Sequence, residues 1–288
     1  MGRKRHESFE NRVGFLFRFK EKMLVRRAKK VSRNYFRLLN KDYLNMTILA
    51  NCSFSEGHGA RADYLGLGML YYTFVHLLNA KVAVCLGSGG GFVPRIMRQA
   101  QRDLDIEKNS RTIVVDADKP KLSYGQPDYL HEGSFLRELF PDIEIVVRTT
   151  IEAADMFIKN RIKIDYLHID ADHSFNGSLS DYKTYRALMA ENFIITLHDT
   201  NTDGVSKTIE QIRKEEDDVE VIDFDYLWGG LAIVKPKKAP SIPVSPQSTF
   251  PVTIDQSRRF VISILKKSFP KLYNRLKQFN GSRKSKGK

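Results

Sequence analysis

The 288-residue sequence contains little cysteine and no long apolar run. Its only two cysteines, Cys52 and Cys85, exclude a disulfide framework. The lack of disulfides is typical of proteins from a reducing compartment. No apolar stretch approaches the roughly 20 residues that a membrane-spanning helix needs. The first ten residues, MGRKRHESFE, contain no apolar segment like that of a secretory signal. We therefore expect a cytoplasmic globular protein.

Charge is distributed unevenly along the chain. Residues 1–45 carry 14 Lys and Arg against 4 Asp and Glu, and residues 235–288 carry 14 against 1. Residues 46–234, in contrast, carry 19 basic and 29 acidic side chains. Two basic arms thus flank an acidic centre, and such asymmetry usually reflects a partner of the arms rather than the fold.

Strand-like apolar runs alternate with helical patterns through the acidic centre, which predicts an α/β fold with a doubly wound, mostly parallel sheet. The predicted strands are 82–86, 111–115, 143–147, 165–169, 193–197, 219–224 and 231–234. The predicted helices are 62–78, 93–104, 151–160, 179–189 and 205–216. We expect the last two strands to be antiparallel. We interpret residues 51–60 as a polar surface loop, with closure of His58 over a bound cofactor as the alternative.

The composition divides the chain into four segments. Residues 1–45 are predicted to be a basic amphipathic helical extension, and 46–235 the α/β domain. Residues 236–256 contain five prolines and are interpreted as an extended linker. Residues 257–288 are expected to form a second basic amphipathic helix and a disordered tail.

One run, KVAVCLGSGGGF at 81–92, combines a buried strand with a glycine-rich loop that opens a helix. Glycines let a backbone turn sharply and approach a ligand, and a helix N-terminus offers free N–H groups. The candidate ligand contacts in the loop are Gly87, Ser88, Gly89 and Gly91. The next strand ends at Asp116, where a carboxylate can hold ribose hydroxyls. We predict a nucleoside-containing cofactor, and Phe92 argues against NAD because a dinucleotide loop has glycine there.

A second cluster of polar side chains follows the fourth and fifth predicted strands, as IDADHS at 169–174 and LHDT at 197–200. Neighbouring parallel strands would bring Asp170 and Asp199 within reach of one ion. With the imidazole of His198, these oxygens suit Mg²⁺ or Mn²⁺, which would lower the pKa of a substrate hydroxyl. The alternatives are that Asp170 and Asp172 cap the next helix and that His198 only binds a neighbour.

In this order and spacing, the glycine loop, the acidic strand end, IDADHS and LHDT resemble class I S-adenosylmethionine-dependent methyltransferases. The resemblance covers about residues 60–235 and is strongest to the small-molecule and sugar O-methyltransferases. It implies a Rossmann-like sheet of seven strands whose final strand is antiparallel. The family usually has an acid two positions before the first loop glycine, where this chain has Cys85.

The resemblance also implies roles for individual residues. Gly87, Ser88, Gly89, Gly91, Asp116 and Asp170 would bind S-adenosylmethionine. The metal ligands would be Asp170, His198 and Asp199. The base that deprotonates the acceptor would be Asp172 or His173.

The activity implied by the resemblance is methyl transfer to a hydroxyl oxygen of a sugar, a glycan or another small molecule, with or without a divalent metal. An RNA methyltransferase with phosphate-binding arms stays open. A non-catalytic cofactor-binding or scaffold protein also stays open, and Cys85 in place of an acid favours it.

The basic arms have three possible partners. Their apolar stripes would pack on the core or on a second copy in a homo-oligomer, or lie on an anionic membrane surface, making the protein peripheral. Nucleic acid ranks behind both.

Overall fold

The computed structural model describes residues 40–117 and 132–237. The predicted C-terminal extension, most of the N-terminal extension and most of the linker lie outside the described residues, so the four predicted segments and the partners of the arms stay predictions. Within the described part, no helix has the length and apolar character to cross a membrane.

Seven strands form one sheet in the order β3-β2-β1-β4-β5-β7-β6. The strands are β1 Val82–Leu86, β2 Arg111–Asp116, β3 Ile143–Val147, β4 Ile164–Ile169, β5 Met189–His198, β6 Val219–Phe224 and β7 Leu231–Pro236. Strands β1 to β5 pair in parallel, whereas β7 is antiparallel to both β5 and β6. The predicted doubly wound, mostly parallel seven-stranded sheet is confirmed.

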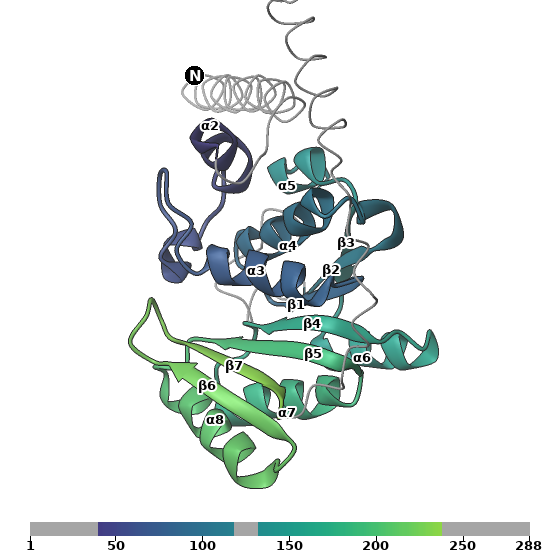
Figure 1. The fold of residues 1–288 in the computed structure, drawn as a ribbon, viewed down its shortest axis with the longest axis vertical. Helices are drawn as coiled ribbons and strands as arrows, with labels where there is room; N and C mark the ends of the chain where they lie inside the picture. The colour runs from purple at the N-terminus through teal and green to yellow at the C-terminus, as the bar shows by residue number, and fades with distance from the viewer. Residues whose placement is uncertain (1–39, 118–131, 238–288) are drawn as a thin grey trace, which may run out of the picture. The chain divides into compact units, whose positions relative to one another are not determined.

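Helices cover both faces of this sheet. They are α2 Lys41–Tyr43, α3 Gly68–Leu78, α4 Phe92–Asp103, α5 Phe135–Leu139, α6 Thr150–Lys159, α7 Phe175–Arg186 and α8 Asp203–Glu215. Three short helical turns accompany them: η1 Leu44–Ile48, η2 Ser55–His58 and η3 Glu107–Asn109. Figure 1 shows α3 and α4 on one side of the sheet and α7 and α8 on the other.

The strands supply two separate apolar cores because successive side chains point to opposite faces. Ala83 and Cys85 of β1 belong to the core under α3 and α4. Val84 and Leu86 belong to the core that α6, α7 and α8 cover. Strands that are buried on both faces explain the continuous apolar runs in the sequence.

Two helices begin four or more residues from the start that the sequence predicted. Helix α7 starts at Phe175 rather than 179, because the Ser174 hydroxyl accepts a hydrogen bond from the Gly177 N–H and caps the first turn. Helix α3 starts at Gly68 rather than 62, because the preceding chain turns through Gly66 with a φ of +53°.

A buried arginine attaches the segment before α3 to helix α4. The Arg95 guanidinium donates to the carbonyls of Ile48 at 3.0 Å and Ala50 at 2.7 Å. The Cys52 thiol then donates to the Gly90 carbonyl at 3.4 Å. These contacts hold residues 48–52 beside the glycine-rich loop, and so place the η2 turn near the ends of the strands.

Candidate functional site

The loop after β1 depends on glycine for a specific steric reason. Gly87 has a φ of +66°, and a Cβ added there would lie 2.2 Å from the Asp170 carbonyl oxygen. Its N–H donates to the Val115 carbonyl at 2.9 Å, and the Asp170 N–H donates to the Leu86 carbonyl at 2.9 Å. Gly89 and Gly91 also have positive φ, and Gly91 immediately precedes α4. The loop therefore lies where β1, β2 and β4 end.

Two other predicted cofactor contacts border the same loop. Ser88 is buried beside the glycines, and half-buried Asp116 is the last residue of β2, the neighbour of β1. The structure thus brings the predicted loop residues and the predicted ribose-binding carboxylate to one edge of the sheet. Their roles in cofactor binding stay predictions.

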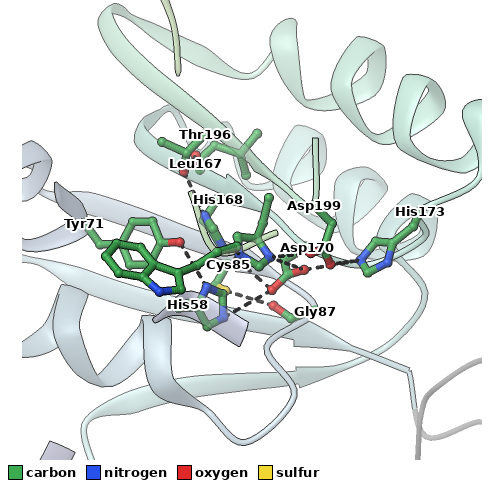
Figure 2. A network of polar contacts seen from close by, with 12 residues as sticks. His58, Tyr71, Cys85, Gly87, Leu167, His168, Asp170, His173, Thr196 and Asp199 are labelled. Atoms are coloured by element: carbon green, nitrogen blue, oxygen red, sulfur yellow. Dashed lines mark hydrogen bonds and ion pairs between the residues drawn. The ribbon is translucent and has the colours of Figure 1, made fainter. Parts of the chain in front are cut away.

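Cys85 occupies the position where the resembling family has an acid. Its thiol donates to the Gly87 carbonyl at 2.9 Å and so closes the turn (Figure 2). Burial and the nearby Asp170 charge raise the pKa of this thiol, which keeps the proton on sulfur. An ionised carboxylate at this position could not make the same hydrogen bond, because it has no hydrogen to donate to the Gly87 carbonyl.

The segment predicted as a surface loop, 51–60, instead packs on the glycine-rich loop. A Cβ on Gly90 would lie 2.3 Å from the Ser53 carbonyl oxygen, and Phe54 lies against Gly89. His58, at the end of this segment, is only 4 % exposed. The expectation of a surface loop is therefore wrong for His58, because the Arg95 contacts turn this segment inward.

Four of the seven histidines converge on one carboxylate, that of Asp170 (Figure 2). The distances from its oxygens to the imidazole nitrogens are 3.3 Å for His173, 3.6 Å for His58, 3.6 Å for His198 and 3.8 Å for His168. The four rings come from η2, from the C-terminal end of β4, from the loop after β4 and from the end of β5. A single charge thus connects elements that are distant in the sequence.

Asp199 completes this Asp–His cluster. One of its oxygens lies 3.3 Å from His173 Nε2 and the other 3.3 Å from His198 Nδ1. Its φ of +56° is unusual for a residue with a side chain, and such strain is concentrated at functional sites. The predicted ligands Asp170, His198 and Asp199 therefore lie together, and the presence of a metal stays a prediction.

The cluster perturbs the acidity of its members in opposite directions. Burial would lower the pKa of His198, but the carboxylates of Asp170 and Asp199 outweigh it and raise the pKa to about 10. Burial, reinforced by His198, lowers the pKa of His58 to about 3. Burial would raise the pKa of Asp170, but the surrounding imidazoles hold it well below its usual value. The ring of His58 is therefore neutral beside an ionised Asp170.

The two candidate bases differ in position. His173 is 30 % exposed and lies between Asp170 and Asp199, and Asp170 raises its pKa. Asp172 points away from the cluster, because its carboxylate accepts the Ser174 N–H at 2.8 Å and packs on Gly177. This placement agrees with the alternative in which Asp172 supports the start of α7, and it favours His173 as the base.

Two histidines of the cluster, His168 and His58, were not predicted from the sequence to lie beside Asp170. His168 carried a signal, because it is a polar residue in an apolar strand and shares a strand face with Asp170, two residues later. His58 was predicted as a loop residue, with closure over the cofactor as the alternative. Its place beside Asp170 was not predicted, because it depends on contacts of Arg95 with residues 47–51.

Residues 84–200 match a protein family described as a methyltransferase domain. A putative O-methyltransferase from Klebsiella pneumoniae is similar in structure, with 14% identity, a TM-score of 0.50, and coverage of 68% of this chain and 90% of that chain. An O-methyltransferase from Bacillus cereus, solved with SAH, shows 15% identity, a TM-score of 0.49, and coverage of 67% and 88%. The O-methyltransferase TomG from Streptomyces achromogenes, solved with SAM, shows 13% identity, a TM-score of 0.49, and coverage of 64% and 87%. No curated protein matches the chain in sequence.

Proposed function

We propose that this chain, whose residues 84–200 match a methyltransferase domain, is a class I methyltransferase that transfers a methyl group from S-adenosylmethionine to a hydroxyl oxygen. The observation that carries the proposal is the pairing of two features at one sheet edge. The loop of Gly87 approaches the backbone of Asp170, and the Asp170 carboxylate contacts the half-buried His173. The proposed nucleoside site thus adjoins the proposed base.

The residues around the loop fit the cofactor. Gly87, Gly89 and Gly91 leave the backbone without side chains at positive φ, and the N-terminus of α4 follows directly. Asp116, at the end of the adjacent strand, is the residue proposed to hold the ribose hydroxyls. S-adenosylmethionine supplies a methyl group on a sulfonium, so the protein needs to orient the acceptor oxygen and remove its proton.

The acceptor side of the site is the Asp–His cluster. The proposed step forms the bond between oxygen and methyl while the sulfur–methyl bond breaks and its electron pair stays on sulfur. The acceptor proton passes to Nδ1 of His173, the ring nitrogen that does not face the two carboxylates. Nε2 keeps its hydrogen and faces Asp170 and Asp199, each 3.3 Å away, which orient the ring and stabilise the imidazolium that forms.

A sugar or another small polyhydroxylated molecule is the proposed acceptor. Exposed aromatic side chains near the cluster support it: Trp228 is 42 % exposed, and its ring is 6.1 Å from that of Tyr64, centroid to centroid. The Trp228 carbonyl also accepts from His198, so this residue borders the cluster directly. An aromatic face can pack on a sugar ring while the sugar hydroxyls stay hydrated or bind polar groups.

The proposal is tested by following labelled methyl groups from S-adenosylmethionine to panels of sugars, glycans, catechols and RNA. Methylation of a hydroxyl in a sugar or glycan is the expected result. Transfer to RNA alone would replace this acceptor class with the alternative drawn from the basic arms. Binding of S-adenosylmethionine without transfer to any panel would favour a non-catalytic protein.

A further inference from the structure

One ring nitrogen of His198, Nε2, must carry a hydrogen because of the atom that it contacts. Its Nε2 lies 3.1 Å from the Trp228 carbonyl oxygen, which only accepts, so this nitrogen carries a hydrogen. In the neutral ring, Nδ1 therefore presents a lone pair. This lone pair faces Asp170 at 3.6 Å and Asp199 at 3.3 Å.

When no metal is bound, a proton on Nδ1 compensates this arrangement, in agreement with the raised pKa of His198. His198 is 4 % exposed, and its Nδ1 has no hydrogen-bond partner among the described residues. A lone pair held against two carboxylates is repulsive unless a cation lies between them, either a proton on the ring or a metal ion. The buried, unpartnered nitrogen thus points to a bound cation.

His58 presents a second imidazole to the same carboxylate. Its Nε2 is 3.6 Å from Asp170 Oδ2, while Nδ1 is 3.0 Å from the Tyr71 hydroxyl. The ring is stacked against Phe92 at 5.4 Å, and its backbone carbonyl accepts from the Leu67 N–H at 2.9 Å. The ring is therefore held from several sides with Nε2 directed at Asp170 (Figure 2).

We infer that His58, His198 and Asp170 bind one divalent transition-metal ion of the zinc type. One ligand atom from each residue lies within 4.8 Å of the others, a spacing that one ion can bridge. Two imidazoles and one carboxylate are the ligands of such ions, whereas Mg²⁺ prefers oxygen ligands in an octahedron. This ligand set replaces Asp199 with His58 and does not favour the Mg²⁺ expected from the sequence.

The neighbours of the two rings support this ligand set. Metal-binding histidines normally use their second nitrogen in a hydrogen bond to a carbonyl, carboxylate or similar group, which fixes the ring. The Trp228 carbonyl meets this need for His198, and the Tyr71 hydroxyl meets it for His58. The ion would join the η2 turn to the ends of β4 and β5, and His173 would stay beside it on the more exposed side.

Cobalt titration of the full chain tests the inference without using methyl transfer. After dialysis against a chelator, the chain should bind one Co²⁺ with the strong visible absorption of a four- or five-coordinate site, and Zn²⁺ should displace it. A large excess of Mg²⁺ should not. His58→Gln and His198→Gln should each weaken binding at least about 100-fold, and Tyr71→Phe about 10- to 100-fold. His76→Gln, a histidine stacked on Tyr72 outside the cluster, should bind as wild type does.

Three results would overturn the site. They are the weak absorption of octahedral Co²⁺, complete competition by Mg²⁺, or equal affinity in wild type, His58→Gln and His198→Gln. If Co²⁺ does not bind at all, the metal site is also wrong, and the cation beside His198 is the proton on its ring. Circular dichroism in chelator checks that each variant folds, and if His58→Gln does not, the wild-type spectrum and Tyr71→Phe decide. Failure of metal binding leaves the proposed methyl transfer standing, because that proposal uses His173.

Discussion

The two halves of the candidate site are built from different materials. The cofactor half, at the ends of β1 and β2, is shaped by backbone: glycines at positive φ, the N-terminus of α4, and one carboxyl at Asp116. The acceptor half, at the ends of β4 and β5, is shaped by side chains, as four imidazoles surround Asp170. Under the proposed function, the backbone-shaped half binds the cofactor, which many proteins share, and the side-chain half determines the chemistry of the acceptor.

The two halves meet at Gly87, so we expect the largest effect on cofactor binding and stability from a substitution of this residue. A Cβ at Gly87 would lie 2.2 Å from the Asp170 carbonyl oxygen and 2.8 Å from Ala171 Cα, both backbone atoms. We expect Gly87→Ala to abolish S-adenosylmethionine binding and to lower the melting temperature strongly. Calorimetry and thermal unfolding measure both.

The control for this variant is Gly133→Ala. Gly133 also has positive φ, at +79°, but nothing lies within 4 Å of an added Cβ. It should therefore cost only the backbone strain, about 1 kcal/mol, and leave cofactor binding intact. Equal losses of cofactor affinity and melting temperature in Gly87→Ala and Gly133→Ala would show that the close approach of Gly87 to Asp170 is unimportant. The two halves would then not be connected at Gly87.

Changing only the acceptor half should separate binding from turnover. His173→Gln is expected to lower kcat roughly 10²- to 10⁴-fold, the range of general-base catalysis, with unchanged S-adenosylmethionine affinity. Asp172→Asn, next to it but directed at Ser174, should retain most of the rate. Steady-state assays with the acceptor found by the labelled screen check this prediction. A larger loss in Asp172→Asn than in His173→Gln would exchange their roles.

The same contrast explains what the sequence could predict. The seven strands, their alternation with helices and the antiparallel pair follow from local patterns, and so does the glycine loop between Leu86 and Phe92. Asp170 and Asp199 could be placed together because parallel strands end at one sheet edge. His58 could not be placed, since its position depends on a buried arginine that binds carbonyls of residues 47–51. The start of α7 was missed because Ser174, not a later residue, caps it.

Removal of the Asp116 carboxyl in the cofactor half should have a smaller effect, confined to the affinity for S-adenosylmethionine. Asp116→Ala would leave the ribose hydroxyls unpaired, which costs about 1 to 3 kcal/mol, or roughly 5- to 150-fold in affinity. Isothermal titration with S-adenosylmethionine measures the loss, and Asp217→Ala, at an exposed acid before β6, serves as the control. Unchanged affinity in Asp116→Ala would place the ribose elsewhere.

The smallest effect is expected outside both halves, at Asp181 of α7. Burial raises the pKa of this carboxyl from 3.8 to about 6, so the folded state binds its proton more tightly than the unfolded state. Stability is therefore lost as pH rises from about 4 to above 6. Asp181→Asn should melt a few degrees higher than wild type at pH 8 and equally near pH 4. A stabilisation that is constant with pH would contradict this origin.

The most direct measurement is isothermal titration of the full chain with S-adenosylmethionine and, separately, with NAD. The account predicts saturable binding of one S-adenosylmethionine per chain, lost in Gly87→Ala and retained in His173→Gln, with no heat from NAD. Binding of NAD instead, or S-adenosylmethionine binding that survives in Gly87→Ala but disappears in His173→Gln, would contradict the division of the site into a backbone-built cofactor half and a side-chain-built acceptor half.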